Sequence, residues 1–148
     1  RQRQMCIRDR VEEKISGALR NSNLSFQAAE TGVRAAEAFL DNLADDSAFL
    51  STQEGLYSLA DEEPNNLFTI NWDNGNSSKL AKLEGILESP RYMIKKLEEL
   101  KTERALNITG YETSANTQTT VIFRITARSM GGNNTAQTIL RTHYAKRF

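Results

Sequence analysis

The sequence predicts an α+β fold, in which a long, amphipathic N-terminal helix packs on a small C-terminal antiparallel sheet, with an irregular loop between them. Three patterns predict it: a helical apolar period from Val11 to about Asp46, turn-forming residues through 45–78, and apolar–polar alternation near the C-terminus. The 148 residues, 39% of them hydrophobic, are enough to form a core without disulfides or metals.

The first ten residues, RQRQMCIRDR, do not continue into the pattern that follows. Residues 4–9 correspond to the codons CAG ATG TGT ATA AGA GAC, which resemble a transposase adapter used in preparing sequencing libraries. We therefore expect residues 1–10 to be translated adapter joined to a truncated gene, and we exclude them from the fold reasoning. Under this hypothesis Cys6, the sole cysteine, is not native.

The predicted helix carries apolar residues along one side, at positions that are alternately four and three residues apart, with Ser22 as the interruption. A helix of about 35 residues is roughly 50 Å long, whereas a compact domain of this size is about 30 Å across. Part of the helix must therefore project or pair with another molecule. We predict that its packing and assembly surface consists of Ile15, Leu19, Phe26, Ala29, Val33, Ala36, Leu40 and Leu43.

A two-stranded coiled coil is the alternative interpretation of this helix. It is less favoured because the apolar side is rich in alanine and few charged pairs flank it. A second apolar line also widens the stripe toward the C-terminal half, as a helix lying on a sheet requires. That line consists of Ala18, Ala28, Ala35 and Phe39.

The loop at 45–78 contains strong turn formers, notably Pro64-Asn65-Asn66 and Asp73-Asn74-Gly75-Asn76. Apolar pieces within the loop are expected to hold it against the rest of the domain. They are Phe49-Leu50, Leu56-Tyr57, Leu67-Phe68 and Trp72. The next stretch, Lys79 to Leu87, has a helical pattern. The stretch after Pro90 is ambiguous, because KKLEELK favours helix whereas Tyr92-Met93-Ile94 favours strand.

The C-terminal part predicts a β-hairpin. Residues 119–129 alternate, with one apolar side formed by Val121, Phe123, Ile125 and Ala127. The glycines and asparagines at 131–135 favour a reversal, and 136–145 resumes the strand pattern. The short segment 105–113 is a further candidate strand.

Charge is distributed in two opposite blocks although the formal net charge is zero. Residues 35–78 contain nine acidic residues and no lysine or arginine, whereas residues 113–148 contain five basic residues and no acidic one. The blocks can pair within one chain, pair between subunits, or form ordinary solvated surface. They do not suggest nucleic acid as a partner, because the basic block is small and lacks a stacking platform.

Catalytic and metal-binding patterns are missing from the sequence. His143 is the sole histidine, and a lone histidine is more often structural than catalytic. Without a second histidine or native cysteines, the usual transition-metal spacings are excluded, and no phosphate-binding or dinucleotide loop is present. We therefore predict a protein that is not an enzyme and has no cofactor, metal or small-molecule substrate.

Three blocks resemble PilX-type minor pilins of the type IV pilus, and they occur in the family's order. NSNLSFQAAETGVRAAEAFL at 21–40 resembles the family's helix, and SPRYMIKKL at 89–97 resembles its Pro-Arg-Tyr strand opening. FRITARSMGGNNTAQTILRTHYAKRF at 123–148 resembles its closing hairpin. The resemblance implies that 91–97 is strand despite its helix propensity. It also implies a pilin helix at 11–46, its membrane-distal half, followed by a periplasmic loop and sheet at 47–148.

The resemblance implies a function in pilus assembly. Minor pilins of this type are bacterial inner-membrane proteins with a periplasmic head, and they join other minor pilins and a tip adhesin in a complex that primes the fibre and remains at its tip. About 20 apolar residues are then expected before Val11 in the intact gene. The alternatives are a type II secretion pseudopilin, which shares the architecture, and a soluble coiled-coil interaction protein.

Overall fold

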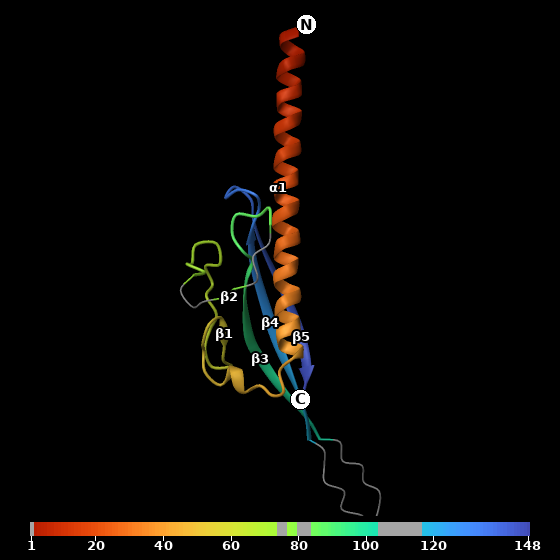
Figure 1. The fold of residues 1–148 in the computed structure, drawn as a ribbon. Coiled ribbons are helices and arrows are strands. Elements are labelled where there is room, and N and C mark those ends of the chain that lie inside the picture. Colours follow the sequence, from red (N-terminus) through yellow and green to blue (C-terminus); the bar gives the residue numbers. More distant parts are fainter. Residues whose placement is uncertain (1, 74–76, 80–83, 104–116) are drawn as a thin grey trace, which may run out of the picture.

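A computed structural model describes residues 2–73, 77–79, 84–103 and 117–148 of the chain. A long helix lies along one face of a sheet and extends far beyond it, so the molecule consists of a head and a projecting rod (Figure 1). The elements in chain order are α1 (Gln2–Asp41), the 3-10 turn η1 (Ser47–Phe49), β1 (Leu56–Tyr57), β2 (Ser78–Lys79), β3 (Arg91–Glu103), β4 (Thr117–Met130) and β5 (Gln137–Arg147). This arrangement confirms the predicted α+β class.

Helix α1 contains 40 residues and is therefore about 60 Å long. It continues through residues 2–10 and ends at Asp41, five residues earlier than the apolar period predicted. The early end has a local cause, because the Lys146 ammonium group donates to the backbone carbonyls of Leu40, Asp41 and Leu43. Leu40 and Asp41 belong to the last turn of α1, where carbonyl groups lack the usual intrahelical partners, and Leu43 follows the helix end.

The sheet has the order β1-β3-β4-β5, with β2 also pairing with β3. The β3–β4 and β4–β5 pairs are antiparallel, and residues 131–136 form the predicted reversal between β4 and β5. The pairing of β1 with β3 is parallel, so the sheet is mixed rather than purely antiparallel as predicted. Residues 91–103 are strand, because β3 lies between β4 and the two short strands and buries Met93 and Ile94 completely.

The helix predicted for Lys79 to Leu87 is wrong where the structure describes it. Ser78 and Lys79 pair with Tyr92 and Arg91 as strand β2, and residues 84–87 form turns and bends. Residues 80–83 and the candidate strand at 105–113 lie outside the described residues. The amphipathic pattern of this stretch was too short to outweigh the pairing that the edge of β3 offers.

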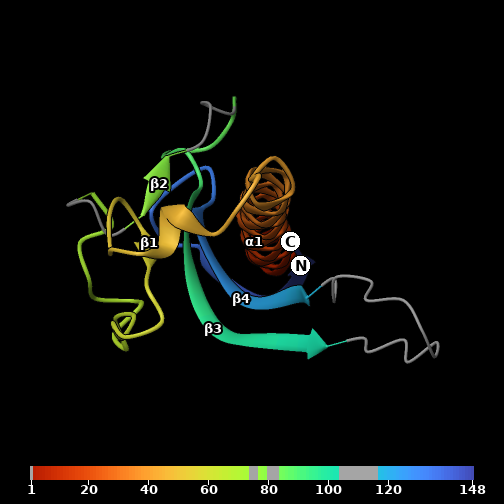
Figure 2. The same cartoon turned by 90° about the horizontal axis from the view of Figure 1, so that it is seen from below.

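Two apolar clusters pack on opposite faces of the sheet, with the helix on its concave side and the loop on the other (Figure 2). Against α1, the predicted strand face is fully buried: Val121, Phe123, Ile125 and Ala127. Under the loop, Tyr57 and Trp72 pack on Met93. Two predicted loop anchors are wrong, because Leu50 and Phe68 are largely exposed.

Candidate assembly surface

The helix leaves the head at Asn21, the most N-terminal buried residue of α1. Its amide Nδ2 donates to Asn133 Oδ1 at 2.6 Å and to Thr135 Oγ1 at 3.2 Å, and its Oδ1 accepts from the Asn133 backbone N at 3.3 Å. Both partners belong to the reversal between β4 and β5. These hydrogen bonds join residues 21–40 to residues 123–148, two of the segments that resemble PilX-type minor pilins.

Small residues allow the helix to approach the sheet closely along this face. A Cβ on Gly131 would lie 2.3 Å from Asn21 Oδ1, and a Cβ on Gly32 would lie 3.1 Å from the Ala127 Cβ. Ser25 is also buried, and its hydroxyl lies 2.6 Å from the Thr138 hydroxyl. The sequence patterns missed Asn21 and Ser25, because a search for apolar periodicity passes over polar side chains that pair inside the fold.

The other end of the packed segment is held by β5. Lys146 Nζ lies 2.6 Å from the Leu40 carbonyl, 2.9 Å from that of Asp41 and 2.6 Å from that of Leu43, where a positive charge also interacts favourably with the helix dipole. The Tyr144 hydroxyl donates to the Asp41 carboxylate, and this hydrogen bond, followed by burial, raises the pKa of Tyr144. The rod is therefore fixed to the head at Asn21 and again about 20 residues later.

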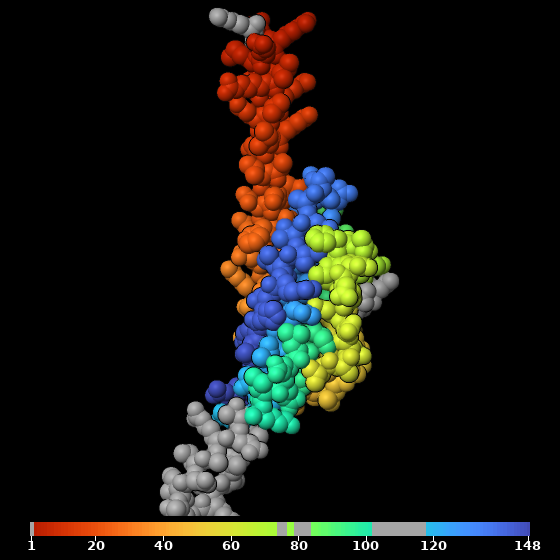
Figure 3. All heavy atoms as spheres, turned by 180° about the vertical axis from the view of Figure 1, so that it is seen from behind, coloured from red at the N-terminus to blue at the C-terminus, as the bar shows by residue number. Residues whose placement is uncertain are grey.

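Beyond the head, the rod exposes apolar side chains on one side. Residues 2–20 are all exposed, as Figure 3 shows for the projecting part of the helix. Ile15, Leu19 and Phe26 lie within about 40° of one another around the helix axis and are 55%, 61% and 46% exposed. Val11 continues the line toward the N-terminus and is 50% exposed. Such a row of unburied aliphatic and aromatic side chains is typical of a helix that packs on another molecule.

The structure divides the eight predicted packing residues between two roles. Ala29, Ala36 and Leu40 are completely buried against the sheet of the same chain, and Val33 and Leu43 pack at the margin of that core. Ile15, Leu19 and Phe26 are the exposed group just described. Assembly through this exposed group remains a prediction. A heptad-like period cannot reveal where the partner of a helix changes from its own sheet to another molecule.

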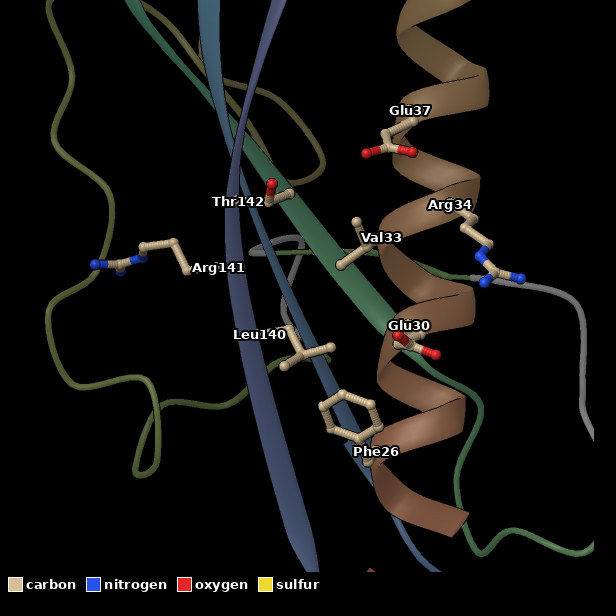
Figure 4. A pocket seen from close by; sticks show the side chains of 8 residues that line it. All are labelled: Phe26, Glu30, Val33, Arg34, Glu37, Leu140, Arg141 and Thr142. Carbon is tan, nitrogen blue, oxygen red and sulfur yellow. The ribbon is translucent and has the colours of Figure 1, made fainter. Parts of the chain in front are cut away.

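A groove of about 360 Å³ follows Phe26 where α1 runs beside β5. Figure 4 shows Phe26 and Val33 from the helix facing Leu140 from β5, with Thr142 farther along the same strand. Arg141 points away from the helix, as the alternation of a strand requires. The groove lining is completed by Glu30, Arg34 and Glu37.

The opposite face of the sheet joins the acidic and basic blocks within the chain. Buried Glu63 from the loop accepts from Arg124 at 2.6 Å and from Arg141 at 3.1 Å, both through Oε1. Beside it, the Lys95 ammonium group donates to the Ser58 and Leu59 carbonyls at 2.5 and 3.0 Å. The Glu63 ion pairs therefore join the two charge blocks, and the Lys95 hydrogen bonds add a further anchor between the loop and β3.

On the helix side, Lys96 forms ion pairs with Asp46 and Glu99. Burial by itself lowers the pKa of Lys96, but the hydrogen bonds and charges of these two carboxylates outweigh burial and raise it. In the loop, hydrogen bonds from Thr52 and Ser58 lower the pKa of Asp61. The Lys96–Asp46 pair joins the segment after α1 to β3, whereas the Lys96–Glu99 pair lies within β3 and the bonds to Asp61 lie within the loop.

Metal-ligating side chains do not cluster in the part of the chain that the structure describes. No group of three or more His, Cys, Asp or Glu side chains there could hold a metal ion. His143 is exposed on β5. Within the same residues, no helix combines the length and apolar character needed to cross a bilayer.

Comparison with family models matches residues 42–146 to the C-terminal region of the type IV pilus assembly protein PilX. The match begins just after α1 ends and includes the loop and β1 to β5. No curated protein and no solved structure matches the chain. Because the matched region covers more than two thirds of the sequence and has the predicted helix packed on it, the chain belongs to the PilX family of type IV pilus assembly proteins.

Proposed function

We propose that the chain is a minor pilin that primes fibre assembly together with other minor pilins and a tip adhesin. Its role is structural and needs no cofactor. Membership of the PilX family supports the involvement in pilus assembly, and the shape of the molecule supports the minor-pilin role. The head is fixed to a rod whose residues 11–20, the part outside the adapter sequence, project for roughly 15 Å beyond it.

The observation that carries the proposal is the exposed apolar row on the rod. Val11, Ile15 and Leu19 are each at least half exposed, although burying one such side chain contributes about 1.5–3 kcal/mol. Side-by-side packing with the helices of neighbouring subunits buries this row by the ridge-and-groove geometry of helix pairs. The three residues occupy two turns of helix, which is enough for several interlocking layers when other subunits contribute equivalent rows.

The proposed location is the inner membrane with a periplasmic head, and then the tip of the assembled pilus. An apolar segment before Val11 in the intact gene is part of this proposal, with residues 1–10 as adapter sequence. Reading the source DNA upstream of Val11 tests both points. A run of about 20 apolar codons is the expected result. Native codons for MCIRDR preceded by hydrophilic sequence would contradict them.

The assembly role is tested by placing the same charge on opposite sides of the rod. Leu19→Asp puts a carboxylate in the apolar row, whereas Gly17→Asp puts it about 160° away, where a side chain meets nothing within 4 Å. Both variants would be expressed from the intact gene, with its own segment before Val11, in a piliated bacterium that lacks its own copy. We expect Leu19→Asp to abolish or strongly reduce surface pili, because an unpaired charge in a helix interface costs several kcal/mol. Gly17→Asp should assemble pili as the unmodified chain does.

The stability of the isolated chain, rod included, distinguishes assembly from folding in this test. Because both positions are exposed and distant from the sheet, each variant should unfold within about 0.5 kcal/mol of the parent. Normal piliation by Leu19→Asp, or equal loss in both variants, would refute the proposed packing side of the rod.

A further inference from the structure

Strand β5 is an edge strand with an exposed side. Over the whole of Gln137–Arg147 it pairs with β4, and among the described residues it pairs with no other strand. In Figure 3, β5 lies at the surface between the helix and the loop. Alternate residues of an edge strand direct their backbone N–H and C=O groups outward, where another extended segment can pair with them. Eleven residues is long for an unprotected edge strand, because strands usually have 3–10 residues and edge strands tend to be short.

One flank of this edge is a mainly apolar groove, whose lining also includes Glu30, Arg34 and Glu37 from the helix. The groove between α1 and β5 runs along the helix-facing side of the strand, with Phe26, Val33 and Leu140 around it (Figure 4). Phe26 remains 46% exposed there. A strand added beside β5 would direct every second side chain toward this groove, because successive side chains point to opposite faces of a sheet. Those side chains must be apolar to be buried beside Phe26 and Leu140.

The other flank is basic. Arg141, His143 and Arg147 alternate along the side of β5 that faces away from the helix, and all three are exposed. Arg141 shares a single carboxylate oxygen of Glu63 with Arg124, so two guanidinium groups face one acid. No acidic residue occurs anywhere in 113–148. An added strand would therefore be favoured if its outward side chains were acidic.

The same charges disfavour a second copy of the chain as the occupant. Pairing β5 with β5 of another molecule would bring two strands with only basic charges beside each other, and like charges on paired strands are destabilising. An edge that repels its own copies but attracts an acidic segment discriminates between partners by charge.

We propose that the free edge of β5 is a docking site for an extended acidic segment of a partner protein, which pairs with β5 as an additional strand. Its inward side chains are apolar and fill the groove beside Phe26 and Leu140. Its outward side chains are acidic and face Arg141, His143 and Arg147. This interaction uses the head, so it goes beyond the packing of the rod at residues 11–19.

A synthetic peptide of alternating valine and glutamate, about nine residues long to match β5, is the probe for this site. It would be titrated into the isotope-labelled full chain and followed by NMR and by amide hydrogen exchange. We expect shifts and added exchange protection at the amides of residues 138–146, with smaller shifts at Phe26 and Val33. A matched peptide with lysine in place of glutamate should bind at least about tenfold more weakly. A valine–glutamate peptide with a central proline should also bind at least tenfold more weakly, because proline removes a ladder donor.

The variant His143→Glu/Arg147→Glu tests the charge contribution from the protein side. We expect it to weaken binding of the glutamate peptide at least about tenfold and to improve binding of the lysine peptide. Arg20→Glu, which reverses one charge on the exposed rod, should leave both affinities unchanged. If the double variant fails to fold, as judged by circular dichroism, the comparison of the three peptides on the parent chain still decides.

Three results would overturn the proposal. They are the absence of binding by the glutamate peptide up to about 1 mM, equal binding of the lysine peptide, and shifts that map away from β5. Dimerisation of the chain through β5 without any peptide would identify a second copy as the occupant and would equally overturn it.

Discussion

Alanine at position 131 tests the junction where the rod leaves the head. A Cβ on Gly131 would lie 2.3 Å from Asn21 Oδ1 and 2.6 Å from the Asn21 backbone oxygen, whereas ordinary contacts begin at 3.4 Å. The helix and the β4–β5 reversal would have to separate by about 1 Å. Overpacking of this kind costs about 1–3 kcal/mol, and the separation also weakens the three Asn21 hydrogen bonds, each contributing about 1 kcal/mol.

We therefore expect Gly131→Ala to lower the free energy of unfolding by about 3 kcal/mol, and the midpoint of thermal unfolding by roughly 9 °C. The matched control is Gly132→Ala, because its Cβ would meet its nearest neighbours at 3.6 Å and its φ is not positive. That variant should be neutral or stabilised by up to about 1 kcal/mol through the entropy of the unfolded chain. Urea and thermal unfolding followed by circular dichroism measure both. Equal effects of the two alanines would refute the close approach of Asn21 to the reversal.

Two further predictions concern the other end of the packed helix. Lys146→Met should destabilise the head by about 2 kcal/mol in urea unfolding, because two carbonyls of the last helical turn and the Leu43 carbonyl after it lose a charged donor. Lys101→Met should change the stability by less than about 0.5 kcal/mol because Lys101 is exposed. Equal losses would contradict the capping role. Tyr144 has a folded pKa raised above its reference of 10.0, so the stability from its bond to Asp41 is fully present below pH 10 and is lost as pH rises through the folded pKa. Tyr144→Phe should therefore be less stable at neutral pH and should lose stability less steeply above pH 10 in urea titrations, and an unchanged slope would contradict this assignment.

Much of the fold could be predicted from sequence because its strongest patterns are local. The alternation at Val121 to Ala127 and the glycine-rich reversal at 131–135 are properties of neighbouring residues, and they identified β4 and β5. The strand at 91–103 could not be derived in this way. Its charged second half favours helix. Only pairing with β4 selects strand, and the β4 partners of that half lie 14 to 24 residues away in the sequence, between Thr117 and Ile122.

The short strands β1 and β2 were even harder to predict from local sequence. Each contributes two residues, which is below the length at which any period can be recognised. Their pairing is decided by tertiary contacts such as the hydrogen bond from Ile94 N to the Gly55 carbonyl, 2.8 Å long. The parallel direction of β1 has no sequence signal at all, so a purely antiparallel sheet was the natural expectation.

The sequence predicted the candidate assembly surface as one continuous row of apolar helix residues, without separating those that pack on the chain's own sheet from those that are exposed. The period located Ile15, Leu19 and Phe26 on the same side of the helix as buried Leu40, but it could not distinguish an external partner from the chain's own sheet. The transition occurs near Asn21, where polar contacts rather than apolar ones begin the packed segment. Polar residues in a helical apolar pattern are therefore worth testing as the boundary of a packed head.

The packing of the rod against neighbouring subunits is tested most directly by cysteine crosslinking in assembled pili. Residues 11–148 contain no cysteine, so single cysteines can be introduced into the intact gene: Leu19→Cys lies in the exposed apolar row and Gly17→Cys lies on the opposite side of the helix. With short bifunctional reagents, we predict that Leu19→Cys crosslinks efficiently to single cysteines placed in the helices of other pilus subunits and that Gly17→Cys does so at least about tenfold less. Equal crosslinking from the two positions, or none from Leu19→Cys in pili that contain the chain, would contradict the account.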